Sequence, residues 1–329
     1  MNIPSPLVKI DSISSESLLR LKGRPIILYK NGEDQQPFFG WAGIEQNLEL
    51  SISKVDAHNA SEREVAAIDS SVIVVGESEE GFVLSGKVAI VSRNHGRSNA
   101  ALIGPVIFYV GESNADQLEL FEKIPKRILM LDATIAARAF RVLLERYVAY
   151  EVAKTMERGL LLIDGSLKES NFEVKEGNLN DIISKCSDRG NYLAGITKNS
   201  RIKQIQRVES SLYSLHEAAY VDVSEIAKLF VSNFSANAYV ARLSPDGIPL
   251  RIDIPSSQAP SEVMASIAAS DIITHGYPET LRSAHLLSIF TAAEEASVKS
   301  MLARNEGTFI LPSFNVRRAL LGKLEGLRK

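Results

Sequence analysis

Three acidic residues occupy positions that the neighbouring sequence makes unusual. Asp69 interrupts one apolar run, Asp164 directly follows another, and Glu145 lies between them in the chain on a predicted helix. A charge inside an apolar strand costs several kcal/mol unless it is paired or binds a metal ion. Three carboxylates brought together repel one another and need a divalent cation to stay ionised. The three acids therefore indicate a candidate metal site.

Oxygen ligands of this kind favour Mg²⁺ or Mn²⁺ over zinc. Such a site suits phosphodiester hydrolysis, in which one ion activates a water and another stabilises the leaving oxygen. Each acid also has a simpler explanation, and the residues alone leave both readings open. The simpler explanations are a local turn at 69–71, an ion pair between Arg141 and Glu145, and a hairpin turn at Asp164–Gly165.

The elements that must position these acids follow from the hydrophobic pattern. Three β-rich runs, 65–75, 82–92 and 101–110, are joined by short links and predict an antiparallel meander. Residues 132–158 lack proline and glycine and carry an apolar stripe at i+3/i+4 spacing, which predicts one long helix. The apolar strand 160–163 follows at once. This order predicts an α/β fold in which helices flank a mixed β-sheet.

Length and composition limit the class of protein. The chain has 329 residues, enough for about two domains or one large one; we predict a small β-rich element at 1–60 and one domain at 61–329. The net charge of −3 provides no global basic field, so contacts with nucleic acid must come from local basic clusters. A single cysteine, no signal-peptide pattern and no apolar run of about 20 residues predict a cytoplasmic protein without a membrane span.

Three residues further along the chain extend the candidate site. A Gly-Tyr-Pro motif at 276–278 precedes a predicted helix that carries His285. His285 could bind metal or position a water or phosphate, Tyr277 could contact a phosphate or stack on a base, and Lys198 could neutralise phosphate charge. The ordinary alternatives are a hydrogen-bonded histidine, a packed tyrosine and a solvated lysine.

An aspartate on the first strand, a glutamate on the helix and an aspartate on the fourth strand is the order of acids in ribonuclease H-like folds. Within that group the sequence closely resembles the NurA nuclease family, over about residues 65–290. The resemblance rests on Ile68-Asp69-Ser70-Ser71, Glu145, Ile163-Asp164-Gly165-Ser166-Leu167, Gly195-Ile196-Thr197-Lys198, Pro249–Pro255, and Gly276-Tyr277-Pro278 with His285 eight residues after the tyrosine.

The resemblance implies a Mn²⁺- or Mg²⁺-dependent nuclease, with one or two ions per active site, that degrades DNA from 5′ to 3′ and cuts single strands internally. It also implies a homodimer that docks on a hexameric HerA-type ATPase, a DNA translocase, and acts in end resection during double-strand-break repair. The residues that would form the catalytic site are Asp69, Glu145, Asp164, Tyr277 and His285, all but the tyrosine as metal ligands. The residues that would contact single- or double-stranded DNA ends are Lys198, Arg201, Arg251 and Tyr277.

One residue departs from the family pattern, which usually has glycine directly after the first aspartate, where this chain has Ser70. The substitution keeps the metal ligand but leaves the local loop geometry open. Ser70 therefore leaves open a catalytically weak adaptor or DNA-end clamp for the translocase, although the retention of all three acids argues against it. A different nuclease of the same fold class, such as a junction resolvase that prefers branched DNA, is a further alternative. A glycoside hydrolase ranks far behind, because aromatic residues make up only 7% of the chain. The candidate docking surfaces for the translocase are residues 1–60 and the basic helix 316–329.

Overall fold

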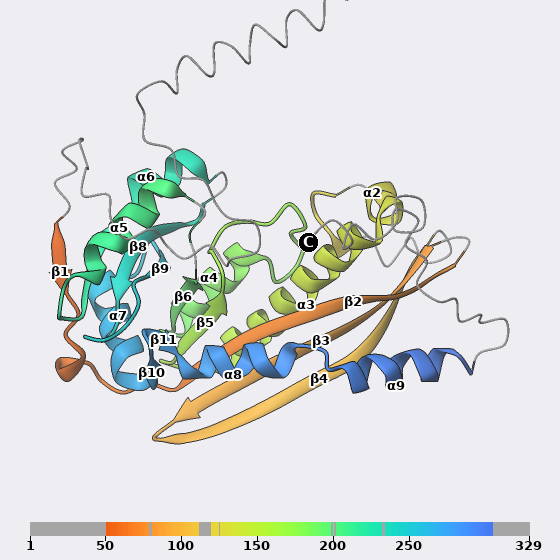
Figure 1. The fold of residues 1–329 in the computed structure, drawn as a ribbon, viewed down its shortest axis with the longest axis horizontal. Coiled ribbons are helices and arrows are strands. Elements are labelled where there is room, and N and C mark those ends of the chain that lie inside the picture. The colour runs from red at the N-terminus through yellow and green to blue at the C-terminus, as the bar shows by residue number, and fades with distance from the viewer. Residues whose placement is uncertain are drawn as a thin grey trace, which may run out of the picture. The chain divides into compact units, whose positions relative to one another are not determined.

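A mixed β-sheet forms the centre of the computed structural model, and its described part has nine strands in the order β1-β7-β8-β9-β6-β5-β2-β3-β4 (Figure 1). All described residues belong to one unit, Glu49–Lys329. The structure describes residues 51–78, 81–111, 120–124, 126–198, 200, 202–231 and 234–304. The strands are β1 (Ile52–Lys54), β2 (Val65–Ser78), β3 (Gly81–Asn94), β4 (Arg97–Gly111), β5 (Leu160–Asp164), β6 (Tyr192–Thr197), β7 (Ala219–Asp222), β8 (Ala236–Arg242) and β9 (Leu250–Pro255).

The first three long strands form the predicted antiparallel meander. β2 pairs with β3 from Val65 to Ser78, and β3 pairs with β4 along nearly its whole length. β5 then returns beside β2 in parallel and β6 lies parallel to β5, whereas β9 joins β6 antiparallel. The predicted fold class, a mixed sheet with flanking helices, is confirmed.

Helices cover both faces of the sheet. The apolar residues on one face pack against α3 to α6, and those on the other pack against α7 and α8. We call these the α3 face and the α8 face. Figure 1 shows α3 running along β2, and α8 lies across β2 and β3. The helices are α2 (Lys126–Leu131), α3 (Ala133–Thr155), α4 (Leu179–Asp188), α5 (Lys203–Tyr213), α6 (Ser224–Phe230), α7 (Pro260–Ser270), α8 (Glu279–Ser288) and α9 (Ala292–Leu302), with a short 3-10 turn, η1 (Ala57–Asn59).

The long helix predicted at 132–158 is α3, which ends three residues earlier than expected. The Asp132 side chain caps its N-terminus by accepting hydrogen bonds from the amides of Thr134 and Ile135. The chain leaves the helix at Met156, and Arg158 adopts a left-handed φ of 49° before β5 begins. No helix in the described part of the chain is long and apolar enough to span a membrane.

Two segments differ from the predicted elements. The stretch 208–232, whose sequence predicts helical pieces, also contains strand β7, because Tyr220 and Val221 are buried between β1 and β8. The helical material expected at 287–303 is interrupted, because Thr291 and Glu294 form a capping box that starts α9 afresh. Within the expected N-terminal element, β1 pairs with β7 and so belongs to the main sheet; residues 1–50 and the predicted tail helix lie outside the described residues.

A buried carboxylate ties α3 to the loop that follows β5. Glu173 is 1% exposed, and its oxygens accept hydrogen bonds from Arg146 Nε at 2.9 Å, the Ser170 amide at 2.9 Å and the Leu179 amide at 3.2 Å. The acid therefore fixes the start of α4 as well as the loop.

Glu173→Ala should lower the free energy of unfolding by about 3–5 kcal/mol, because it leaves the Arg146 guanidinium buried without its partner. Chemical denaturation measures this loss. The control is Glu169→Ala on the same loop, which removes partly exposed contacts with Lys123 and Asn180 and should cost less than about 1 kcal/mol. Equal losses for the two variants would contradict the assignment.

Candidate active site

The candidate site lies where β5 stops and β2 continues. β5 pairs with β2 only from Val65 to Ile68, although β2 runs on to Ser78. Among the described strands, none pairs with this edge of β2 beyond Ile68. Asp69 and Ser70 therefore lie at the carboxyl end of β5, beside Asp164. Because side chains alternate along a strand, Asp69 faces α8 and Ser70 faces α3.

Asp69, Asp164 and His285 meet on the α8 face. The His285 Nδ1 atom lies 2.6 Å from Asp69 Oδ2 and 3.8 Å from Asp164 Oδ2. One ligand atom from each of the three residues lies within 4.8 Å of the others. Asp69 is further held by Ser288 Oγ at 3.2 Å and by the Ser70 amide at 2.8 Å. The geometry brings two carboxylates and an imidazole together as the sequence predicts.

Asp164 also contacts the two other polar residues that the sequence singled out. Lys198 Nζ lies 2.8 Å from Asp164 Oδ2, and the Tyr277 hydroxyl donates to Asp164 Oδ1 at 3.4 Å. Burial raises the pKa of Tyr277 well above its usual range, and the negative charges of Asp164 and Asp69 add to the shift. The tyrosine therefore stays protonated and acts as a hydrogen-bond donor at this site.

A tight turn sets the position of Tyr277. The strands β10 (Ile273–Thr274) and β11 (Tyr277–Pro278) are joined by His275 and Gly276, both left-handed, with φ of 53° and 89°. The backbone of Ile248 supports this turn by donating to the His275 carbonyl at 3.0 Å. A Cβ on Gly247 would lie only 2.7 Å from the Gly276 Cα, so the two loops pack backbone to backbone.

Glu145 approaches from the opposite face of the sheet. It lies on α3, and its Oε2 is 3.4 Å from Ser70 Oγ, which also donates to the Arg141 carbonyl at 3.2 Å. Burial raises the pKa of Glu145 to about 7; the charges of Arg146 and Arg141 oppose the rise, and those of Asp69 and Asp164 increase it. Glu145 is thus outside the cluster of Asp69, Asp164 and His285, but it is close enough for the charges of the two aspartates to affect its pKa.

The structure shows the backbone geometry at Ser70, where the sequence departs from the family pattern. β2 is continuous through this residue, which is 4% exposed and pairs with Val88 of β3. The position therefore has ordinary strand geometry, and the serine side chain occupies the space between β2 and α3.

The residues predicted to contact DNA are placed differently from one another. Lys198 is 43% exposed beside Asp164, a position open to solvent. Arg251 differs from the prediction: it is 4% exposed, and its Nε lies 2.8 Å from Asp253 Oδ1, so its guanidinium is enclosed. Arg201 lies outside the described residues. Sequence reasoning also missed Ser288, although its spacing of three from His285 places both on one side of a helix.

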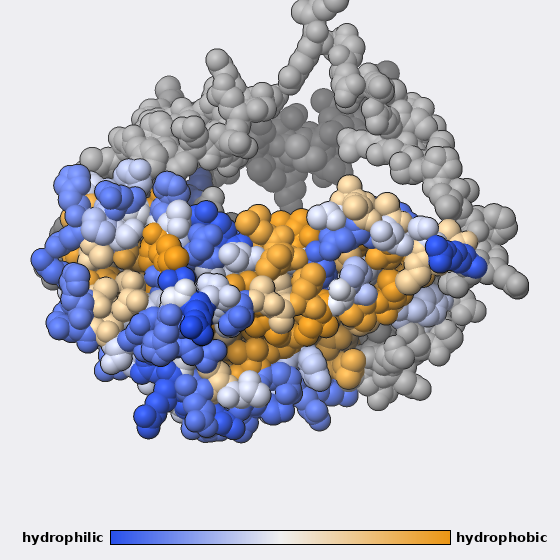
Figure 2. All heavy atoms as spheres, turned by 90° about the horizontal axis from the view of Figure 1, so that it is seen from below, coloured by the Kyte–Doolittle hydropathy of each residue, from blue (hydrophilic) through white to orange (hydrophobic). Residues whose placement is uncertain are grey.

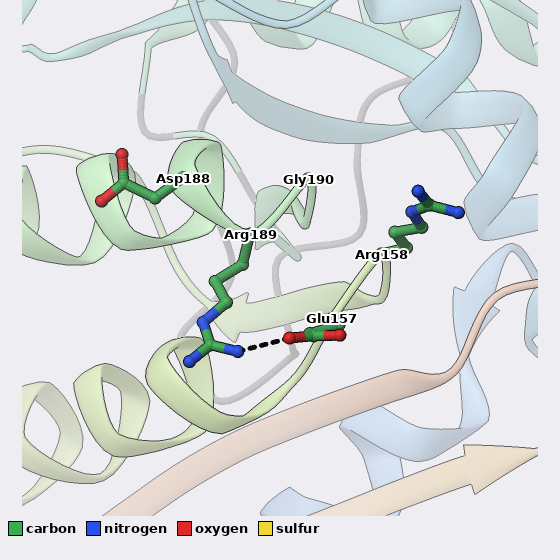
Figure 3. A pocket seen from close by; sticks show the side chains of 5 residues that line it. All are labelled: Glu157, Arg158, Asp188, Arg189 and Gly190. Atoms are coloured by element: carbon green, nitrogen blue, oxygen red, sulfur yellow. Dashed lines mark hydrogen bonds and ion pairs between the residues drawn. The ribbon is translucent and has the colours of Figure 1, made fainter.

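A surface pocket of about 550 Å³ lies at the other end of β5 (Figure 3). It is lined by Glu157, Arg158, Asp188, Arg189 and Gly190, and an ion pair of 2.6 Å joins Arg189 to Glu157. Arg158 precedes the start of β5, whereas Asp164 ends it, which separates the two places by the length of the strand. The pocket is therefore distinct from the candidate site.

Comparisons with known proteins agree with this fold. A family model described as NurA domain matches residues 63–288. The NurA nuclease from Sulfolobus solfataricus has a similar structure, with a TM-score of 0.51 and 14% identity over 91% of this chain and 94% of that one. A second NurA structure has a TM-score of 0.47 and 9% identity, covering 93% and 99%. Human ENDOV has a TM-score of 0.38 and 12% identity, covering 73% and 86%. A comparison with curated protein sequences finds no match.

The mixed sheet flanked by helices gives this chain the same overall fold as the NurA nuclease from Sulfolobus solfataricus. The family model covers more than half of the chain, so the chain belongs to the NurA family. The structures with TM-scores below 0.5 add no weight to this assignment.

Because the pKa of Glu145 is raised, we predict that in the absence of metal this residue lowers the free energy of unfolding as the pH rises. Between pH 4.5 and about 7 the folded protein keeps a proton on Glu145 that the unfolded chain releases, so this group lowers stability as pH rises. With EDTA present, Glu145→Gln should be more stable than wild type at pH 8 by about 1–3 kcal/mol, and similar to it at pH 4.5. Denaturation at both pH values measures the difference. A Glu145→Gln variant less stable than wild type at pH 8 would show that the carboxylate is well solvated or paired.

Proposed function

We propose that this protein is a divalent-metal-dependent nuclease that hydrolyses phosphodiester bonds in DNA at the opening beyond β5. The observation that carries the proposal is the meeting of Asp69, Asp164 and His285, with one ligand atom of each within 4.8 Å of the others. Membership of the NurA family supports it independently.

The donor set fits Mn²⁺ or Mg²⁺, with one or two ions per site. Two carboxylates are the hard oxygen ligands that these ions prefer, and an imidazole nitrogen is compatible with Mn²⁺. Asp69, Asp164 and His285 would hold the ion, and Glu145 would join them from the α3 face. The bound ion would supply Lewis acidity toward water and the scissile phosphate. A positive charge here would also favour the ionised form of Glu145, whose pKa is raised by burial and, to a smaller extent, by the neighbouring acids.

The surrounding residues supply binding and orientation. The Lys198 ammonium is half-exposed beside Asp164, so it can neutralise a phosphate that enters from solvent. The Tyr277 hydroxyl, kept protonated by burial, can donate a hydrogen bond to a phosphate oxygen or to Asp164. His285 is 42% exposed, which leaves its ring accessible to substrate as well as to Asp69.

The finer description of the activity follows from the family resemblance. It comprises 5′-to-3′ degradation of DNA ends, internal cutting of single strands, and a role in end resection during double-strand-break repair together with a hexameric HerA-type translocase. The candidate docking surfaces for that partner, residues 1–60 and 316–329, lie almost wholly outside the described residues. Their separate deletion, followed by a binding assay with the translocase, would identify which one is needed. The cytoplasmic location stays a prediction.

Cleavage of linear DNA labelled at the 5′ or the 3′ end tests the proposal. With Mn²⁺ or Mg²⁺ we expect degradation that EDTA abolishes and that Asp164→Ala reduces at least about 100-fold, because the loss of a metal ligand removes several kcal/mol of transition-state stabilisation. The control is Asp188→Ala, which replaces an exposed acid of α4 that forms an ion pair with Lys185 and should cleave like wild type.

The two labels report the direction of degradation, and a branched substrate assayed in parallel tests the junction-resolvase alternative. Repeating each reaction with the cognate translocase present tests the partnership. If no condition gives cleavage while DNA or translocase binding is retained, the nuclease proposal is wrong and the adaptor alternative stands.

An exposed apolar surface supports the homodimer. Leu102 of β4 and Leu286 of α8 are 46% and 64% exposed. Figure 2 shows apolar side chains gathered on the side of the molecule where β4 lies. Apolar surface gathered in this way marks protein interfaces. β4 is the last strand of the described sheet, and no described strand pairs with its outer edge.

Leu102→Glu should therefore weaken or abolish self-association, because dimer formation would bury the new charge. Sedimentation velocity across a concentration series measures the effect. Leu229→Glu on α6 is the matched control, since Leu229 is 81% exposed on another element, and this variant should associate like wild type. A monomeric wild type, or equal association of all three proteins, would remove the homodimer from the proposal.

A further inference from the structure

A buried ion pair on β9 lies behind the loop that follows Asp164. Asp253 is fully buried, and its Oδ1 and Oδ2 accept hydrogen bonds from Arg251 Nε at 2.8 Å and Nη2 at 3.1 Å. The two residues are two positions apart on one strand, so both side chains lie on the α3 face. The guanidinium also lies 5.2 Å from the centre of the Phe234 ring.

The remaining hydrogen bonds of this pair go to the loop. Asp253 Oδ2 accepts a hydrogen bond from the Leu167 amide at 3.0 Å, and Arg251 Nη2 donates to Ser166 Oγ at 3.2 Å. The two loop residues in these hydrogen bonds, Ser166 and Leu167, are the second and third residues after Asp164. The pair thus holds the chain directly beyond the end of β5.

The same loop also packs against β6. The Gly165 amide donates to the Ile196 carbonyl at 2.8 Å, and Gly165 has a φ of 116°. A Cβ on Gly195 would lie 2.6 Å from the Gly165 carbonyl oxygen and 2.9 Å from Leu167 Cγ. The loop therefore fits only against a bare backbone at Gly195, and its path is tightly defined.

Stability alone is a weak explanation for such a pair. The cost of removing two charges from water often exceeds their mutual attraction, and well-packed apolar residues can replace a buried pair at little cost. The hydrogen bonds to Ser166 and Leu167 are different, since only a polar pair in this geometry can make them. They act on the segment that carries Asp164.

We propose that Arg251 and Asp253 are positioning residues for the metal-binding carboxylate of Asp164. By fixing Ser166 and Leu167, the pair holds the end of β5 so that Asp164 is directed toward Asp69 and His285. This inference rests on the proposed function. It also assigns Arg251 a role inside the fold in place of the DNA contact predicted from its sequence.

Outer contacts that orient metal ligands typically contribute 10–100-fold to metal affinity or activity. Asp253→Asn keeps the shape of the side chain but removes the charge that pairs with Arg251. We expect this variant to bind Mn²⁺ about 10–100-fold more weakly than wild type, as measured by calorimetric titration of the full chain. We also expect faster hydrogen exchange of the Leu167 amide in the metal-free protein.

Two further measurements separate positioning from a general loss of structure. Raising the Mn²⁺ concentration should restore DNA cleavage by Asp253→Asn, because its ligands are intact, but should not restore cleavage by Asp164→Ala. The control is Glu209→Gln on α5. Burial raises the pKa of this carboxylate to about 7 and the nearby Arg251 charge opposes the rise, whereas the hydrogen bonds from the ion pair to Ser166 and Leu167 do not involve Glu209. Glu209→Gln should bind Mn²⁺ like wild type.

Arg251→Lys provides a second variant if Asp253→Asn does not fold. Lysine keeps the charge, but its single ammonium cannot reproduce the forked contacts with Asp253 and Ser166, so Mn²⁺ binding should again weaken. A folded Asp253→Asn or Arg251→Lys variant with wild-type Mn²⁺ affinity and wild-type exchange at Leu167 would overturn the inference while the proposed function stands. A wild type that neither binds Mn²⁺ nor cleaves DNA would overturn the proposed function, and this inference with it.

Discussion

The candidate site depends on the difference in length between two neighbouring parallel strands. β5 stops at Asp164, whereas β2 continues well past Asp69, so the described part of the sheet has an opening at this point. Residues from both faces reach the opening: His285 comes from α8, and Glu145 comes from α3 beside Ser70. Had β5 matched β2 in length, the extra strand would lie between Glu145 on the α3 face and the two aspartates on the α8 face.

The second requirement of the candidate site is that the negative charges of its carboxylates be balanced by neighbouring groups. Two carboxylates face each other, and the structure compensates them with the His285 ring, the Lys198 ammonium and the Tyr277 hydroxyl. Glu145 lies nearby on the α3 face. Burial raises its pKa to about 7, and the charges of Asp69 and Asp164 add to the rise. A cluster whose members repel one another and can be relieved by a cation is characteristic of a functional site, because it would be a liability in a purely structural role.

Much of this site follows from local sequence patterns, and the rest depends on long-range packing. The placement of Asp69 and Asp164 could be predicted because each breaks an apolar run, and α3 could be predicted from its uninterrupted helical pattern. The approach of Glu145 from the opposite face could not, since it depends on which side of β2 packs against α3. The burial of Arg251 was missed because basic residues are ordinarily exposed; only the acid two positions later hints at an internal pair. Similarly, β7 is a strand because of its neighbours β1 and β8, which are distant in sequence.

The central claim is that the opening beyond β5 binds a divalent cation through Asp69 and Asp164. Anomalous diffraction from crystals soaked in Mn²⁺ tests it most directly, because the signal locates manganese without reference to activity. We expect a peak within about 2.0–2.6 Å of oxygens of both carboxylates, with His285 or Glu145 as a further ligand. A fully occupied peak elsewhere, with none between Asp69 and Asp164 at saturating Mn²⁺, would contradict the claim.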